Sequence, residues 1–451
     1  MLVRFTVTNF QSFKNESEFT MVASENMKHR NHIFLCNKIR VLKGAFIYGA
    51  NASGKSNFIR SIAFAQKLIT KGFDNVDYKN KFYRLDSEYA DHPGVFQFDI
   101  FTKGCFYSYG FAISYKNGML EEEWLYDVTD FKKERCIFGR KRKADGTFEI
   151  ESEIKFNNKD DENRFNVYKK DAESPNMSQT FFLKDVASRS LDSDSYKAFT
   201  DVYTWFGKLI IIFPDSRYIG GMSQLIDEDI SKNNMGNLLR EFDTGIEGIS
   251  KNELNIDKVM NSIEEQEATK IGMLSSPSKE GSCSILLRNR RSLMEIVNNP
   301  NDKIHLYELR FNHGNREDLF EYGDESDGTK RLINLLPLFQ LMEAHSDLVI
   351  FVDELDRNFH SELTKQFVSS YFKLAENKNV QLIVTTHETS LLNLDFVRQD
   401  EVWFIDRKTE VGSTLYSLNA FPDCTNTEKE YLLGRYGGVP VFNQIMNIKE
   451  V

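Results

Sequence analysis

The segment from Gly49 to Ser56, Gly-Ala-Asn-Ala-Ser-Gly-Lys-Ser, constrains this chain more than any other. It fits the pattern G-x-x-x-x-G-K-[ST], in which glycines let backbone N–H groups turn inward around phosphate oxygens. We expect an apolar strand before this loop, over 43–48, and a helix after it, over about 56–70. Such a helix points its positive N-terminal end at the phosphates. The segment therefore predicts a nucleotide-phosphate site between a strand and a helix.

Lys55 and Ser56 supply the charged and polar side chains of this loop. In a loop of this pattern the lysine reaches the β- and γ-phosphates, and the serine hydroxyl binds Mg²⁺. The segment thus predicts a nucleotide and Mg²⁺ as ligands. The loop residues that we expect to hold them are Gly49, Asn51, Ala52, Ser53, Gly54, Lys55 and Ser56.

A pair of carboxylates follows an apolar run later in the chain. Leu348–Val352 is typical of a buried strand, and Asp353 and Glu354 come directly after it. Such a strand delivers side chains to its carboxyl end, where ligands gather in α/β sheets. We expect Asp353 to hold the hydration shell of Mg²⁺ and Glu354 to polarise an attacking water. Together with the loop, this pair predicts phosphoryl transfer to water.

Two further segments place polar residues at the ends of expected elements. Ser326 and Gly328 stand at the start of a helix expected over 328–344, an arrangement that presents a hydroxyl and free N–H groups to an anion. His387 follows a strand expected over 380–385, where it would sense a γ-phosphate. Both segments are consistent with a nucleotide site.

Secondary-structure patterns divide the chain into three regions. Residues 94–155 carry short alternating segments with turn signals, which predicts an antiparallel meander within an N-terminal lobe over 1–215. We expect a helical insertion over 216–300 that binds a partner, because residues 222–280 are polar, charged and helix-prone; Ser284–Phe320 has a strand-like character. Residues 301–451 alternate helices and strands, which predicts a parallel sheet covered by helices. The expected fold class is α/β.

Composition excludes several classes of protein. Hydrophobic residues make up 41% of the chain, so disorder is excluded as its main state. No apolar run is long enough to cross a bilayer and the N-terminus lacks a signal-peptide core, so we expect a cytoplasmic protein without a membrane partner. The chain has 5 cysteines and no CxxC pair, which argues against a disulfide framework or a thiolate zinc site.

Charged clusters bear on whether nucleic acid is a partner. The net charge is −10, whereas proteins that coat nucleic acid usually carry a basic balance. Basic residues gather over 132–143, on an expected hairpin with its turn near Asp145; we interpret them as a solvated tip, with phosphate contact as the alternative. The acidic clusters at 192–194 and 227–229 are interpreted as solvated loops. His29 and His32 form a pair without further ligands.

The order of these motifs resembles the heads of ABC-type ATPases, within the branch that includes SMC, RecF and overcoming-lysogenization-defect proteins. The resemblance rests on the phosphate loop, Ser326-Asp327-Gly328, the strand that ends in Asp353-Glu354, and His387. In this superfamily a strand pair precedes the loop, as residues 3–21 are expected to do here. The resemblance implies an ABC-type P-loop ATPase head with an antiparallel β-meander lobe and a helical insertion.

The resemblance also implies how such heads work. Two heads sandwich two ATP molecules, and the signature of the partner completes each site. Ser326 and Gly328 would then act in trans, Asp356 would lie in the D-loop, and His387 would be the switch histidine. The assembly would be a homodimer or a higher homo-oligomer.

Two residues are assigned through this resemblance alone. Asn57 follows the Gly-Lys-Ser of the loop as it does in these ATPases, and Gln179 is the candidate for the glutamine loop. No residue that reads the base can be identified, so GTP stays an alternative to ATP.

A closer likeness is to the standalone ATPase components of bacterial abortive-infection systems of the AbiL and PARIS types. It implies an ATP-hydrolysing switch that controls a separately encoded effector in anti-phage defence and responds to a phage-derived trigger. The alternative is a RecF-like DNA-repair or recombination ATPase that DNA activates. The segments that carry the likeness are Phe46–Phe58, Glu123-Trp124-Leu125, Ser326–Pro337, Asp353–His360, Val384–Leu392 and Tyr431–Pro440.

Overall fold

The structure is a computed structural model in which the chain divides into two units, and each unit is described by itself. The described residues are 1–130, 132–189, 193–214, 235–255, 283–288, 291–298, 305–315, 317–422, 424 and 426–439. The first unit comprises Met1–Phe213, Asp347–Leu355 and Ala375–Val451. The second unit comprises Pro214–Ser346 and Asp356–Leu374.

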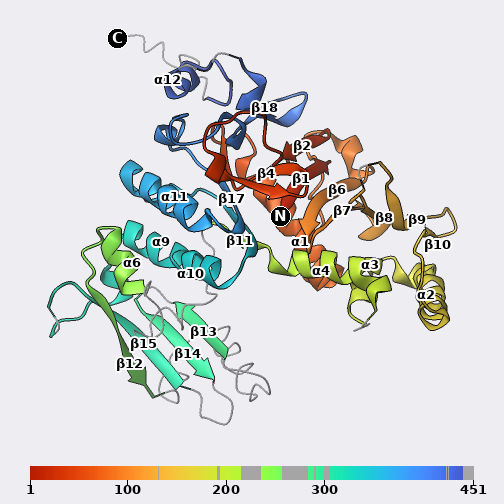
Figure 1. The fold of residues 1–451 in the computed structure, drawn as a ribbon, viewed down its shortest axis with the longest axis horizontal. Helices are drawn as coiled ribbons and strands as arrows, with labels where there is room; N and C mark the ends of the chain where they lie inside the picture. The colour runs from red at the N-terminus through yellow and green to blue at the C-terminus, as the bar shows by residue number, and fades with distance from the viewer. Residues whose placement is uncertain are drawn as a thin grey trace, which may run out of the picture. The chain divides into compact units, whose positions relative to one another are not determined.

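A mostly parallel sheet in the first unit carries the phosphate loop (Figure 1). Its strand order is β11-β16-β17-β5-β18-β19, and only the edge strand β19 runs antiparallel to its neighbour. Because β5 pairs with β17 on one side and β18 on the other, the loop that follows it begins in the interior of the sheet. The strands are β5 (Gly44–Tyr48), β11 (Ile210–Ile212), β16 (Asp347–Val352), β17 (Asn379–Thr385), β18 (Val402–Lys408) and β19 (Gly412–Ser417).

A seven-stranded antiparallel sheet forms the second layer of this unit, in the order β10-β9-β8-β7-β6-β1-β2. Its strands alternate buried and half-exposed residues, as the period of two requires when one face packs on a core. The strands are β1 (Leu2–Thr8), β2 (Ser17–Thr20), β6 (Gly94–Thr102), β7 (Cys105–Ser114), β8 (Met119–Asp127), β9 (Arg135–Arg142) and β10 (Phe148–Glu151). A small ribbon joins β3 (Ile33–Cys36) to β4 (Ile39–Leu42).

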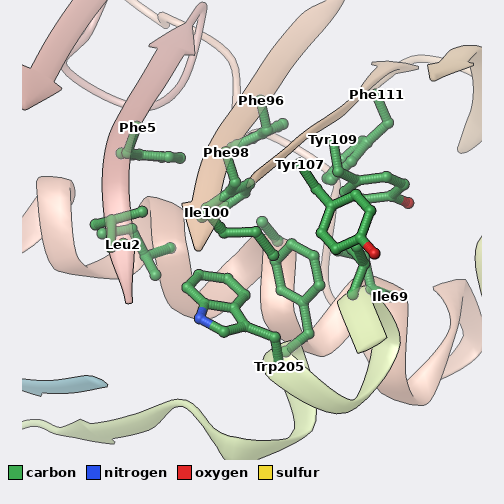
Figure 2. Packing of buried hydrophobic residues seen from close by; sticks show 14 of the residues in the cluster. Leu2, Phe5, Ile69, Phe96, Phe98, Ile100, Tyr107, Tyr109, Phe111 and Trp205 are labelled. Atoms are coloured by element: carbon green, nitrogen blue, oxygen red, sulfur yellow. The ribbon is translucent and has the colours of Figure 1, made fainter. Parts of the chain in front are cut away.

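An aromatic core joins the antiparallel sheet to the helices of the first unit. Figure 2 shows Phe5, Phe98 and Trp205 packed together, with ring centroids of Phe5 and Phe98 4.6 Å apart. Phe98 also meets Phe206 of α4 edge to face at 5.0 Å, so this helix is anchored on β6. The helices are α1 (Lys55–Lys71), α2 (Lys159–Ala172), α3 (Phe182–Ala187), α4 (Lys197–Lys208) and α12 (Thr427–Leu432).

The second unit has an antiparallel sheet of its own, in the order β12-β15-β14-β13. Phe242, just after α6, stacks on Phe339 of α10 with centroids 6.2 Å apart, which ties the helices of this unit together. The elements are α6 (Met235–Glu241), β12 (Gly248–Leu254), β13 (Cys283–Arg288), β14 (Leu293–Asn298), β15 (His305–Asn312), α9 (Asp327–Leu335), α10 (Pro337–Ala344) and α11 (Ser361–Ala375).

Most of the expected architecture is confirmed. The α/β class, the strand pair before the loop, the meander and the hairpin with its turn near Asp145 are all present. The helix expected over 328–344 breaks into α9 and α10 because Pro337 cannot donate a helical hydrogen bond. After β17, where the alternation of strands and helices predicts a helix over 388–394, the chain forms only a short 3₁₀ turn, Thr389–Leu391.

The prediction of a helical insertion over 216–300 is wrong for β12, which is a strand. Among the other residues described there, α6 is helical, and β13 and β14 agree with the strand-like character expected from Ser284 onward. Gly248–Leu254 is rich in polar residues, so its composition does not favour a strand. All seven residues nevertheless pair with β15, which supplies their backbone hydrogen bonds. The two units also interleave along the chain instead of following the boundaries at 215 and 300. The acidic cluster at 227–229 lies outside the described residues.

Candidate nucleotide-binding site

The phosphate loop depends on backbone conformations and close approaches that suit glycine. Gly54 has a φ of +118°, and a side chain there would run into the hydroxyls of Ser413 and Ser12. A side chain at Gly49 would run into the carbonyl oxygen of Ile405. The loop is thus seated tightly on neighbouring backbone, and its two glycines are required by space as well as by φ.

Lys55 lies inside the loop that precedes it. The residue is only 6% exposed, and its Nζ donates hydrogen bonds to the carbonyl oxygens of Gly49 (2.7 Å) and Ala50 (3.1 Å). Helix α1 begins at Lys55, and its N-cap residue is Gly54, which has no side chain to accept a hydrogen bond from the first turn. The N–H groups of that turn and the lysine ammonium together form a site of positive potential that suits phosphate.

Ser56, Asp353 and Thr385 form a hydroxyl–carboxylate cluster beside the loop. The Ser56 hydroxyl donates to Asp353 Oδ1 (3.2 Å), and the Thr385 hydroxyl donates to the same oxygen (2.6 Å). The backbone N–H of Glu354 donates to Thr385 Oγ1 (2.8 Å), and Glu354 has a φ of +51°. The parallel pairing of β16 with β17 brings both strand ends to this edge of the sheet, as the sequence predicted for Asp353.

The donor set of this cluster fits Mg²⁺. Hydroxyl and carboxylate oxygens are the ligands that a small hard cation takes, and a nucleotide-bound Mg²⁺ is usually held by one or two protein oxygens together with phosphate and water. Ser56 and Asp353 supply such a pair, and Asp353 is almost wholly buried. Among the described residues, no group of three or more His, Cys, Asp or Glu side chains is placed to hold a metal ion. The pair of His29 and His32 is therefore not part of such a group.

Residues from distant parts of the chain hold the loop from outside. Asn57 donates to Ser12 Oγ (2.9 Å), and the Ser413 hydroxyl donates to the carbonyl oxygen of Ser53 (2.5 Å). A hollow of about 470 Å³ opens next to Ser12 and Asn57 and is also lined by Arg407 and by residues 77–85. Of these residues, only Asn57 was assigned to the site from the sequence. No sequence signal identified Ser12, Ser413 or Arg407.

The signature residues come together within the second unit. Ser326 caps α9: its hydroxyl accepts from the N–H of Thr329 at 3.1 Å, and the residue is exposed. A Cβ atom at Gly328 would lie 2.8 Å from the carbonyl oxygen of Asn358, so the start of α9 packs directly on the turn that contains Asp356. Only glycine allows that approach.

Comparison with known proteins decides the family. A family model described as "AAA domain, putative AbiEii toxin, Type IV TA system" matches residues 45–393, which is well over half of the chain. The chain belongs to this family. It is therefore a P-loop ATPase, and the matched range runs from the strand before the phosphate loop to the segment after the strand-end histidine.

Solved structures of SMC heads also resemble this AAA-family chain, at a coarse level. The SMC head domain from Thermotoga maritima is 14% identical with a TM-score of 0.34, over 92% of this chain and 98% of that one. An SMC head bound to the C-terminal winged-helix domain of ScpA is 15% identical with a TM-score of 0.37, over 92% and 97%. An SMC head from Pyrococcus furiosus, bound to the C-terminal domain of ScpA, is 13% identical with a TM-score of 0.36, over 93% and 97%. No curated protein sequence matches.

In this family member His387 lies directly beyond the end of β17. The residue is exposed, and the N–H of Thr386 before it donates to the carbonyl oxygen of Ile47 (3.1 Å). The Tyr48 hydroxyl donates to the carbonyl oxygen of Glu388 (3.2 Å) on its other side. His387 is thus carried by backbone that is hydrogen-bonded to the strand leading into the phosphate loop.

Glu123 and Gln179 have structural contacts in the first unit. The Glu123 carboxylate is buried and accepts from the N–H groups of Phe182 (2.7 Å) and Leu183 (3.0 Å) and from the Tyr109 hydroxyl (3.0 Å). Gln179 donates to the carbonyl oxygen of Gly118 (2.8 Å). Both residues fasten the start of α3 to the meander, and these contacts do not involve the phosphate loop.

Replacing Glu123 with alanine should destabilise the fold by about 3–5 kcal/mol, since it leaves a buried cation without its counter-charge and leaves two backbone N–H groups and a tyrosine hydroxyl without their acceptor. The partner is Arg140, which is also buried and lies 3.7 Å from the carboxylate. Chemical denaturation of the nucleotide-free protein measures this change. Glu122→Ala on the same strand is the matched control, because its ion pair with Lys141 is exposed and should cost less than about 1 kcal/mol. Equal midpoints for the two variants would contradict the assignment.

The cations of strand β9 in the basic hairpin are paired with carboxylates or buried. Arg135 pairs with Asp127 (2.7 Å), Lys141 with Glu122 (2.7 Å) and Arg142 with Glu121 (3.5 Å), while Arg140 is buried. Each of these acids lies on the adjacent strand β8. For β9, cross-strand pairing favours the solvated interpretation over phosphate contact, since the cations of this strand already face carboxylates.

Proposed function

We propose that this chain is an ATP-hydrolysing switch that dimerises on ATP and controls a separately encoded effector in anti-phage defence in the cytoplasm. The observation that carries the proposal is the cluster of Ser56, Asp353 and Thr385 beside the phosphate loop. The family description, which names a toxin of a toxin–antitoxin system, supports the defence context. No helix among the described residues is long and apolar enough to cross a membrane.

The proposed chemistry rests on positioning and charge. Mg²⁺, held by Ser56 and Asp353, would neutralise phosphate charge when it is bound. Lys55 would exchange its hydrogen bonds to Gly49 and Ala50 for the β- and γ-phosphates. Glu354 would accept a hydrogen bond from the attacking water and orient it, in a turn that the Thr385 hydroxyl holds in place. His387 would donate to the γ-phosphate.

The proposed dimer uses the second unit of each protomer. Ser326 is exposed at the start of α9, so its hydroxyl is accessible to the nucleotide of a partner subunit. Gly328 and the Asp356 turn pack together there, which gives the signature a defined shape without the partner. Asp356 would lie at the dimer interface as the D-loop residue.

Ser326→Arg should abolish ATP-dependent dimerisation and turnover while leaving ATP binding by the monomer intact, since the substitution blocks only the trans contact. Light scattering with and without ATP, together with phosphate release, measures these outcomes. Mixing Ser326→Arg with Lys55→Ala should restore turnover that neither variant has alone, up to about half of the wild-type value, because each mixed dimer has one intact site. Mixed samples without activity would rule out the composite site.

The partner is tested by affinity purification of tagged Glu354→Gln protein with ATP from its native host. A stoichiometric protein encoded nearby, without nuclease-sensitive material, would support effector control. The alternative function, a RecF-like DNA-activated ATPase, predicts DNA or repair proteins in that sample and a turnover that DNA stimulates in a salt-dependent way. Recovery of DNA without a neighbour-encoded protein would overturn the effector proposal.

A further inference from the structure

The C-terminal segment, residues 426–438, packs against the strand that leads into the phosphate loop. Tyr431 and Tyr436 both stack on Phe404 of β18, with ring centroids 5.4 Å and 5.5 Å away. Tyr431 also meets Tyr48, the last residue of β5, at 5.8 Å. These contacts lie within the first unit and place an aromatic side chain next to residue 49.

The Tyr431 hydroxyl connects this segment to the first residue of the loop. It donates to the carbonyl oxygen of Gly438 (3.1 Å). Burial raises the pKa of Tyr431 to about 12, and the nearby backbone of Gly49 partly opposes that rise. The hydroxyl therefore stays protonated at neutral pH and donates to Gly438, whose backbone lies on Gly49.

Gly438 brings its own backbone onto the loop. It has a φ of +65°, and a Cβ atom on it would lie 3.4 Å from the Cα atom of Gly49. The two glycines thus face each other with no side chain between them. A backbone contact of this kind transmits displacements directly, because packed atoms leave no space to absorb them.

A second contact joins the segment to the residues after His387. The Thr389 hydroxyl donates to Glu428 Oε1 (2.8 Å), and Thr389 stands two residues beyond His387. The C-terminal segment therefore touches both elements that would respond to a γ-phosphate, which are the phosphate loop and the strand-end histidine segment.

We propose that Tyr431 is a positioning residue for the phosphate loop and that the C-terminal segment couples the loop to the His387 segment. Lys55 holds the carbonyl oxygen of Gly49, and Tyr431 holds Gly438, whose backbone lies against the Cα atom of Gly49. If Lys55 moves to the phosphates, as the proposed function requires, Tyr431 keeps this glycine in place. Since glycine is the most conformationally free residue, an outside contact is what preserves the shape of the loop.

The test compares Tyr431→Phe with Tyr436→Phe as its matched control. Both variants keep the ring on Phe404, but the Tyr436 hydroxyl contacts Glu430 and not the loop. Tyr431→Phe should weaken ATP·Mg²⁺ binding about 5-fold in calorimetry, the effect of one lost hydrogen bond, and should raise KM while kcat at saturation changes less than twofold. Hydrogen exchange in the peptide that spans residues 46–53 should become faster in the nucleotide-free protein. The control should change neither quantity.

Two results would overturn the positioning role. One is unchanged affinity and exchange in Tyr431→Phe, and the other is an equal change in both variants, which would indicate general loosening of the segment. A wild-type protein that binds no ATP would overturn the proposed function instead. The exchange measurement needs no nucleotide, so it decides the role of Tyr431 in that case as well.

Discussion

Glu354→Gln is expected to bind ATP as tightly as the wild type but to hydrolyse it about 10²–10⁴ times more slowly, the usual effect of removing a group that handles a proton. Glutamine has nearly the same shape, and the backbone N–H of residue 354 keeps its hydrogen bond to Thr385. The turn after β16 should therefore survive, while the carboxylate charge that polarises the attacking water is lost. ATP should then hold the protein in the dimer.

Single-turnover phosphate release and light scattering measure the two halves of this prediction. Glu362→Gln is a suitable control, since Glu362 is an exposed carboxylate on α11 that pairs with Lys365. It should hydrolyse ATP at the wild-type rate. Equal turnover by Glu354→Gln and the wild type would remove Glu354 from the catalytic assignment, while loss of binding would point to a structural role.

Lys55→Ala should reduce ATP affinity by about 100-fold, because it removes charge-assisted hydrogen bonds to phosphate that no nearby side chain replaces in the described loop. Nζ of Lys55 donates to the backbone carbonyl oxygens of Gly49 and Ala50, and alanine is compatible with the first turn of α1. The fold should persist, with a melting temperature close to that of the wild type.

Calorimetric titration of ATP·Mg²⁺ and a thermal melt check this result together. Lys67→Ala is the matched control, since Lys67 lies on the same helix but is exposed to solvent. It should bind ATP normally. Wild-type affinity in Lys55→Ala would exclude the loop as the phosphate site, and a large loss of thermal stability would leave the affinity change without a specific cause.

The sequence by itself determined the part of the candidate site that is contiguous. The loop from Gly49 to Ser56 is legible because its glycines, lysine and serine stand at a spacing set by phosphate geometry. The placement of Asp353 beside Ser56 was also predictable, since an apolar strand carries its carboxyl end to the edge of a parallel sheet. The roles of these residues remain predictions that the substitutions above test.

Sequence reasoning misjudged one part of the region over 216–300 for a physical reason. Strands of an antiparallel sheet obtain their backbone hydrogen bonds from partners that are distant in sequence, so polar segments such as Gly248–Leu254 take a form that their own composition does not favour. The assignment of Gln179 to a glutamine loop likewise finds no support in its contacts, because its side chain holds Gly118.

Only the tertiary structure decided which distant residues surround the loop. Thr385 lies 32 residues from the carboxylate of Asp353 to which it donates, and Gln179, Ser413 and Tyr431 take their contacts from the packing of separate elements. A hydroxyl on a strand end or an aromatic near the C-terminus has no spacing rule that identifies it, because its partner is set by how strands pair and segments pack. The sequence determined the ligand chemistry, and the fold determined the residues that hold it in position.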